Sequence, residues 1–153
     1  MPLSEEDLRS WASLATLMEW LPRALDAQLQ RDAGLTHFEF GILYALAHAD
    51  AHTLRMSVLA GYSNSSLTRL SRAVSRLEGP GWVRRSTDPD DGRYTLATLT
   101  DAGLRQVELA EPGHVELVQQ LVFDSLTSTQ ARQLGEISRR IMTAIGDGGG
   151  WTP

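Results

Sequence analysis

Arginine and hydroxyl side chains recur at helical spacing between residues 64 and 77. On a helix at about 100° per residue, one narrow stripe holds Ser65, Arg69, Arg72 and Arg76. A second stripe, centred about 150° away and expected to face the core, holds Leu67, Leu70, Val74 and Leu77. A helix fits the major groove of DNA, where Arg can pair with two acceptors of guanine. The candidate contacts are Asn64, Ser65, Ser66, Thr68, Arg69, Arg72 and Arg76. The alternative is the solvated face of an ordinary amphipathic helix.

More arginines lie in the hairpin predicted directly after this helix. Arg84 and Arg85 fall on its first strand, and Arg93 follows the turn formers of residues 88–92. A projecting hairpin can carry an Arg into the narrow minor groove of DNA, where the negative potential is enhanced. Asp91, two residues before Arg93, is placed to pair with it and hold it extended. The alternative is a surface hairpin with an ion pair of low energetic value.

The charge distribution agrees with a nucleic-acid partner, although the chain is acidic overall at −5. Residues 55–85 carry six Arg against one Glu, a local charge of +5, whereas residues 1–54 and 86–153 carry −5 each. Charges act locally because salt screens them beyond roughly 8–10 Å. The basic segment therefore stands between two acidic ones.

Capping signals and apolar periodicity predict the elements that position these residues. Helices are expected over about 5–30, with a kink near Pro22 and Gly34 closing the element, and from Thr36 to about His48, where Thr36 and Glu39 form a first capping box. Further helices are expected over 54–60, over 64–78 and within 101–145. In the range 101–145 we expect a kink or break at Pro112-Gly113 and a second capping box, of Thr127 and Gln130, that opens a separate last helix. Strands at 82–86 and 94–99 form the hairpin. The predicted class is mostly α (α+β), with a helix-turn-helix, a two-stranded hairpin after it and long flanking helices.

Composition narrows the function classes. A chain of 153 residues with 42% hydrophobic and 22% charged residues fits one folded domain. It has no cysteine, which excludes disulfides, thiolate metal sites and thiol-based oxidant sensing. No apolar run spans a bilayer and the first residues are acidic, so we expect a cytoplasmic protein without a membrane partner. No catalytic constellation can be assembled, so we expect no enzyme, no metal and no cofactor.

Three segments together resemble the wing signature of the MarR (multiple antibiotic resistance regulator) family. They are residues 77–85 (LEGPGWVRR), 88–93 (DPDDGR) and 99–103 (LTDAG). The resemblance extends over about residues 5–145 and implies a winged-helix homodimer that binds pseudo-palindromic operator DNA and is often released by a small ligand. It also implies that residues 64–78 form the recognition helix and that Arg93 is the wing-tip residue. The interruption at Pro112-Gly113 departs from the family pattern.

These inferences divide the single chain into regions. Residues 36–100 are expected to form the DNA-binding region, 5–30 and 101–145 the dimerisation helices, and 146–153 a flexible tail. The family resemblance implies an apolar ligand pocket, for which the candidates are Trp11, Trp20, Phe38, Phe40 and Tyr44. The alternative for these aromatic residues is packing in the core and the dimer interface. The predicted function is a transcriptional regulator, with a repressor favoured. The alternative function is a winged-helix protein–protein interaction module without DNA readout.

Overall fold

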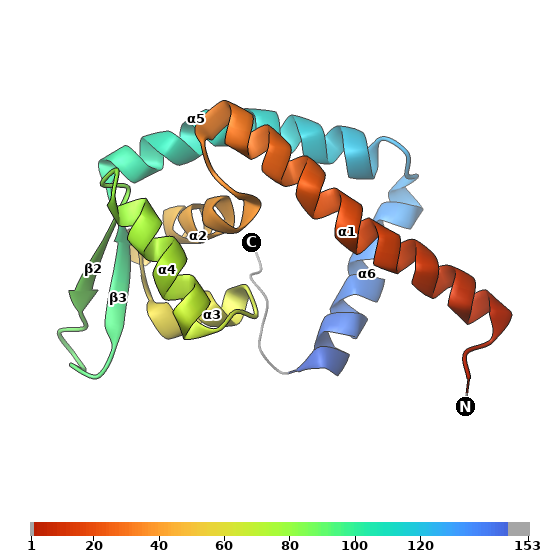
Figure 1. The fold of residues 1–153 in the computed structure, drawn as a ribbon, viewed down its shortest axis with the longest axis horizontal. Coiled ribbons are helices and arrows are strands. Elements are labelled where there is room, and N and C mark those ends of the chain that lie inside the picture. Colours follow the sequence, from red (N-terminus) through yellow and green to blue (C-terminus); the bar gives the residue numbers. More distant parts are fainter. Residues whose placement is uncertain (1, 147–153) are drawn as a thin grey trace.

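The computed structural model describes residues 2–146, so the tail predicted at 146–153 lies outside the described residues except for Gly146. Figure 1 shows two long helices, α1 (Glu5–Ala33) and α5 (Asp101–Val118), crossing at the top of the molecule. On one side lie α2 (His37–Ala47), α3 (Met56–Tyr62), α4 (Leu67–Glu78) and a small sheet. On the other side α6 (Ser128–Ile145) extends away. The predicted winged helix-turn-helix class is confirmed.

Local capping chemistry fixes where the first helices begin and end. Ser4 accepts a hydrogen bond from the Asp7 backbone N–H, and Gly34 ends α1 in the left-handed conformation at φ 67°. The predicted capping box of Thr36 and Glu39 opens α2, with both reciprocal hydrogen bonds present. α1 continues through Pro22 without interruption. A proline removes only one backbone hydrogen bond, which a helix of 29 residues can lose without ending.

The wing sheet contains a strand at a position where the sequence predicts helix. β1 (Thr53–Arg55), β3 (Thr95–Leu99) and β2 (Val83–Thr87) form an antiparallel sheet in the order β1-β3-β2. The helix predicted over 54–60 is therefore wrong at its start, because Leu54 pairs with Ala97 on β3. The sheet has three strands where two were predicted. β1 exists through pairing with residues more than 40 positions away, which no local pattern reveals.

The start of α4 also differs from the prediction. Ser66 is its N-cap and accepts a hydrogen bond from the Arg69 backbone N–H at 3.2 Å. Asn64 adopts a positive φ of 44°, so the chain turns there and cannot yet be helical. Asn64 and Ser65 consequently lie in the turn between α3 and α4, not on the helix.

α5 is joined tightly to the wing and runs further than predicted. A Cβ on Gly103 would overlap the Trp82 carbonyl oxygen and the Leu99 side chain, so only glycine allows this approach. Of the predicted kink or break at Pro112-Gly113, the break is wrong: α5 continues through both residues to Val118 and then widens into a π-helical turn over Gln119–Phe123. The second predicted capping box, Thr127 with Gln130, opens α6.

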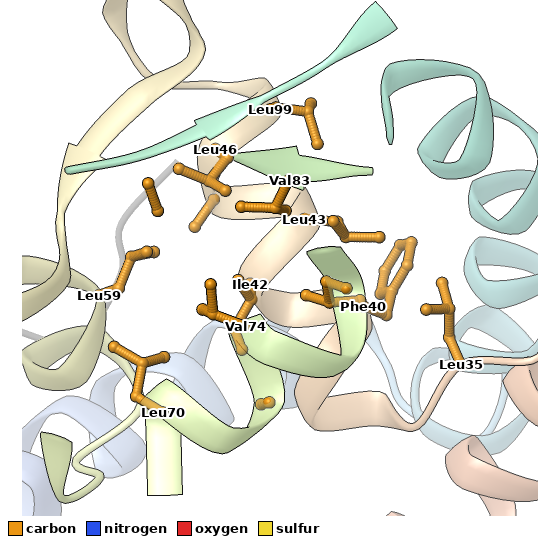
Figure 2. Packing of buried hydrophobic residues seen from close by; sticks show 14 of the residues in the cluster. Leu35, Phe40, Ile42, Leu43, Leu46, Leu59, Leu70, Val74, Val83 and Leu99 are labelled. Carbon is orange, nitrogen blue, oxygen red and sulfur yellow. The ribbon is translucent and has the colours of Figure 1, made fainter. Parts of the chain in front are cut away.

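The core lies between α2, α4 and the sheet. Figure 2 shows side chains from these elements packed around α2, including Leu43, Leu46 and Val83. Leu70, Val74 and Leu77 of α4 are almost fully buried there, as their stripe predicts. The fourth residue of that stripe, Leu67, is a correction, because 57% of its surface is exposed. It sits in the first turn of α4, where the core has ended.

Large apolar side chains remain exposed on the long helices. Those of α1 include Leu8, Trp11, Leu17, Met18 and Trp20; those of α6 include Leu134, Ile137, Ile141, Met142 and Ile145. α6 contains no buried residue in the single chain. Apolar faces of this extent are typical of surfaces that bind another protein chain. Within residues 2–146, no helix combines the length and apolarity needed to cross a bilayer.

Candidate nucleic-acid interface

Burial of one side of α4 determines which of its side chains face outward. The buried residues Leu70, Ala73, Val74 and Leu77 define the inner side. At about 100° per residue, the direction opposite to them is occupied by Thr68, Arg72 and Ser75. Arg69 and Arg76, predicted to point outward with Arg72, lie on the flank of α4 that faces α2. The arginine stripe is thus turned partly toward the protein.

Both flanking arginines contact α2. The guanidinium of Arg69 lies 4.2 Å from the ring centroid of Phe38, a cation–π distance. Nε of Arg76 donates to Oε1 of Glu39 at 2.7 Å. The Arg76 side chain is still 60% exposed, so its outer guanidinium nitrogens face solvent. Arg69 and Arg76 therefore hold α4 against α2 and keep a positive outer edge.

Glu39 is the buried partner in this contact. Oε2 accepts the Thr36 backbone N–H of the capping box, while Oε1 accepts from Arg76. Burial raises the pKa of this carboxyl, but the hydrogen bonds from Thr36 and Arg76 lower it more, so the pKa lies below its ordinary value. A single ionised side chain thus fixes the start of α2 and the position of α4 relative to it.

Arg72, unlike Arg69 and Arg76, is not held by another side chain of the part of the chain that the structure describes. It is exposed, and among the described residues it makes no hydrogen bond or ion pair. Thr68, one turn earlier, is also exposed. Ser65 donates its hydroxyl to the Ser66 carbonyl in the preceding turn. The outward face of α4 therefore presents one unpaired arginine and short hydroxyl side chains, which suits a polar partner rich in acceptors.

Arg85, predicted as a contact residue, is engaged inside the chain. From β2 it donates to Oε2 of Glu78 at 2.7 and 3.0 Å, to the Ser71 hydroxyl at 3.0 Å and to the Ser75 hydroxyl at 2.8 Å. Its backbone N–H also donates to Glu78, whose pKa is lowered chiefly by the Arg85 side chain. These bonds fasten the wing to α4 and favour a positioning role. Arg84, the adjacent residue on the strand, is exposed.

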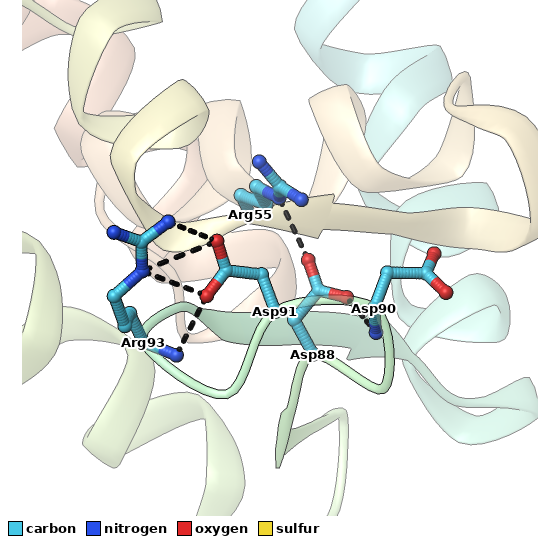
Figure 3. Close-up of polar contacts among 5 residues, drawn as sticks. All are labelled: Arg55, Asp88, Asp90, Asp91 and Arg93. Atoms are coloured by element: carbon cyan, nitrogen blue, oxygen red, sulfur yellow. Dashed lines mark hydrogen bonds and ion pairs between the residues drawn. The ribbon is translucent and has the colours of Figure 1, made fainter.

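At the wing tip, Arg93 is paired with Asp91. Nε and Nη2 of Arg93 donate to the carboxylate of Asp91, at 2.9 and 2.6 Å, as Figure 3 shows. The hydrogen bond from Arg93 lowers the pKa of Asp91, so the pair stays ionised. The Arg93 side chain is 83% exposed although it is paired. The pairing predicted from sequence is therefore present, and it orients the guanidinium without covering it.

A second pair at the base of this loop was not predicted from the sequence. Arg55 on β1 donates to Asp88 at 2.7 Å and lies 4.3 Å from the ring centroid of Tyr94. Asp88, which is buried, also accepts the Asp90 backbone N–H, and that hydrogen bond is the main cause of its lowered pKa. Figure 3 shows the two pairs side by side. Because Arg55 and Asp88 are 33 positions apart, only the third strand brings them together.

Two cavities lie beside α2. The larger, of about 820 Å³, lies between α1, α2, α3 and α4 and is lined by Phe38, Tyr44 and the three arginines of α4. A smaller one of about 340 Å³ lies between α2 and α5, where Phe40 and Tyr44 meet His114. The predicted pocket residues Trp11 and Trp20 line neither cavity and are exposed on α1. No cluster of three or more potential metal-ligating side chains occurs in the described part of the chain.

Comparison with known proteins gives concordant matches. Residues 35–95 match the model of the MarR family. The chain is 44% identical to Sco3205 of Streptomyces coelicolor, a MarR family transcriptional regulator crystallised in complex with DNA. The match covers 94% of both chains with a TM-score of 0.92. AbsC, a MarR family regulator of the same organism, is 28% identical over 95% of this chain and 97% of its own, with a TM-score of 0.89.

A curated relative matches over a shorter stretch. It is YdcH of Bacillus subtilis (strain 168), an HTH-type transcriptional regulator that is 36% identical over 93 residues. That match covers 58% of this chain and 61% of the relative's length. It extends over less than two thirds of either protein.

The buried carboxylate gives the first testable prediction. A carboxyl whose pKa is lowered in the folded state stabilises it above the ordinary pKa, near 4.5, and loses that contribution as the pH falls through the folded-state value. Glu39→Gln should lower the free energy of unfolding by about 1–3 kcal/mol at pH 7, because Arg76 and the Thr36 N–H lose an ionised acceptor. The deficit relative to wild type should shrink as the pH falls below the ordinary value of about 4.5, since Glu39 itself becomes protonated only there. Denaturant unfolding at several pH values measures this, with the exposed Glu108→Gln as control. A deficit independent of pH would contradict it.

Proposed function

The chain belongs to the MarR family of transcriptional regulators, and from this premise we propose that it binds operator DNA as a homodimer. The observation that carries the proposal is the outward face of α4, where Arg72 is exposed and unpaired between two flanks that are tied to the rest of the domain. Further support comes from the relative Sco3205, which was crystallised with DNA. The proposed role is transcriptional repression.

In this proposal α4 enters the major groove. Its first half carries Thr68 and Arg72, the part of a recognition helix that meets base edges. Ser65, Ser66 and Asn64 lie in the turn before it and are assigned to phosphates. Arg69 and Arg76, held sideways against α2, are assigned to the phosphates that flank the groove. Arg76 uses only Nε for Glu39 and its side chain is 60% exposed, so it can also reach a phosphate. Phosphate contacts position a protein, whereas base contacts specify the sequence.

The wing is assigned to the adjacent minor groove. Arg93 is the side chain proposed to enter it, oriented by Asp91. Arg84, exposed on β2, is assigned to a phosphate. Arg85, which was predicted among the contacts, is assigned a positioning role, because its donors already bind Glu78, Ser71 and Ser75.

Dimerisation is assigned to the exposed apolar faces of α1 and α6. Together with α5 they correspond to residues 5–30 and 101–145, which leaves 36–100 as the DNA-binding region. A two-fold dimer presents two copies of α4, so the operator should contain inverted half-sites about 10 bp apart, one turn of B-DNA. We place the protein in the cytoplasm, where that DNA would be reached.

We also propose that a small-molecule effector binds in the larger cavity. Phe38 and Tyr44 line the larger cavity, which also contains the arginines assigned to DNA. A ligand bound there would alter the position of α4. Trp11 and Trp20 are assigned to the dimer face. We propose no enzymatic activity, since the relatives are regulators. The alternative function, a protein–protein interaction module without DNA readout, is tested by the measurement of duplex binding described below.

The dimer assignment predicts a specific effect on molecular mass. Wild-type chains of 16.8 kDa should sediment at about twice that mass at micromolar concentration. Ile137→Glu places a charge on the apolar face of α6 and should shift the equilibrium strongly toward the monomer. Val58→Glu, at an exposed apolar position on α3, should leave the dimer intact. Wild-type protein that sediments only as a monomer would refute the assignment.

The contact assigned to Arg72 predicts a loss of specificity. The operator is obtained by selecting fragments of the source genome that the wild-type protein binds. A duplex with the same bases in scrambled order serves as the comparison. Arg72→Ala should reduce discrimination between them by about 1–3 kcal/mol, the worth of a bidentate base contact. Arg105→Ala, an exposed arginine on α5, is the matched control and should retain discrimination.

Salt dependence separates this proposal from the alternative function. Duplex binding by the wild type should weaken steeply with rising salt, because each phosphate contact releases counterions. If Arg72→Ala lost the same affinity for the operator as for the scrambled duplex, Arg72 would have no base-reading role. Failure of the wild type to bind any duplex would favour the protein–protein module.

The wing assignment predicts an order among three variants at one loop. Arg93→Ala should weaken operator binding roughly ten-fold, about 1.4 kcal/mol, with thermal stability unchanged because the tip is exposed. Asp91→Ala should have a smaller effect of the same sign, since Asp91 only orients Arg93. Asp90→Ala is the control: its side chain forms no hydrogen bond or ion pair within residues 2–146, and binding should not fall. The reverse order of Arg93 and Asp91 would sink the assignment.

A further inference from the structure

Leu67 is an apolar side chain in a surface that is otherwise polar. It is the first residue of α4 and is 57% exposed, while Leu70, the next leucine of the helix, is completely buried. Its neighbours in the chain, Ser66 and Thr68, are exposed and carry hydroxyl groups. Within the described part of the chain, nothing covers it sufficiently to bury it.

The position of Leu67 places it where base edges would be met. A recognition helix reaches bases mainly through its N-terminal residues. Leu67 and Thr68 are the first two residues of α4, so both lie on the turn that would enter the groove first, while Arg72 lies about 140° around the helix from Leu67. Phosphate contact does not suit Leu67, because it has no donor.

The chemistry of the side chain then restricts what it can read. In the major groove, each base pair presents donors and acceptors, and thymine alone adds an apolar 5-methyl group. Hydroxyl and guanidinium groups contact the donors and acceptors, whereas an aliphatic side chain gains by covering the methyl. Ser66, its neighbour, already uses its hydroxyl oxygen to cap the helix at Arg69. The apolar element of this surface is thus provided by Leu67.

We propose that Leu67 is a specificity-determining residue that packs on the 5-methyl group of one thymine in each half-site. The proposal rests on the DNA-binding function proposed above. The side chain would complete its burial only on DNA that carries a methyl group at that position. It would therefore add a preference for thymine that is separate from the base contact assigned to Arg72.

Removing only the methyl group is the direct test. The probe is a duplex selected by the wild-type protein from a random-sequence pool, in which each thymine in turn is replaced by deoxyuridine. This change leaves base pairing intact. For one thymine per half-site, wild-type binding should weaken about four-fold, the equivalent of about 0.8 kcal/mol for one buried carbon group. Leu67→Ala should bind the thymine and deoxyuridine forms equally.

Two further variants exclude trivial explanations. Leu67→Met keeps an apolar side chain at the position and should retain a preference for the methyl group. Val58→Ala, a truncation at an exposed apolar residue of α3, should respond to deoxyuridine as the wild type does. Thermal unfolding of Leu67→Ala should match the wild type, because the position is exposed.

The outcomes separate this inference from the function on which it rests. If the wild type selects no duplex from the pool, the proposed function fails. If it selects duplexes but no thymine position is sensitive to the methyl group, the role of Leu67 is overturned and the function stands. That role is likewise overturned, with the function intact, if Leu67→Ala responds to deoxyuridine as strongly as the wild type does.

Discussion

Helix α4 is fixed in rotation about its own axis by two arginine–glutamate pairs on opposite flanks. Arg76 of α4 reaches Glu39 of α2 on one side, and Glu78 of α4 receives Arg85 of β2 on the other. Between them the row from Leu70 to Leu77 is buried in the core. α4 is thus held on both flanks and on its buried side, which leaves one face for a partner. The positions of the Glu39 and Glu78 carboxylates determine which face that is. Glu39 extends this constraint to the start of α2 through its capping box.

Ion pairs also determine which arginines of the basic segment remain available to a partner. The segment 55–85 has a local charge of +5, but not all of its arginines are equally available. Arg85 has its guanidinium in a network of hydrogen bonds, and Arg55 is bound to Asp88. Arg72 and Arg84 remain exposed. The carboxylates thus sort the arginines into those that shape the surface and those that present charge on it, which a count of charges along the sequence does not reveal.

Features that depend on a few adjacent residues were predictable from the sequence. Both capping boxes, the left-handed end of α1 at Gly34 and the Asp91–Arg93 pair each arise within four positions of chain. Features that depend on distant partners were not. Residues 54–55 of β1 were predicted as helix because their strand character comes from pairing with β3. Arg85 was predicted as a DNA contact because its partners Ser71, Ser75 and Glu78 lie on another element. Helical periodicity placed Leu67 inward, since periodicity cannot show where the core ends.

α6 has no buried residue within a single chain, so its stability should depend on the concentration of the protein. Helices in proteins owe most of their stability to packing of an apolar face, so in the proposed dimer the second chain would supply much of what holds α6 in place. Folding of this end of the molecule and assembly then become one equilibrium, whose midpoint moves with protein concentration. Occupancy of a two-fold DNA site would vary with the square of the monomer concentration once the dimer dissociates. A small change in the abundance of the protein would accordingly produce a steeper change at the operator.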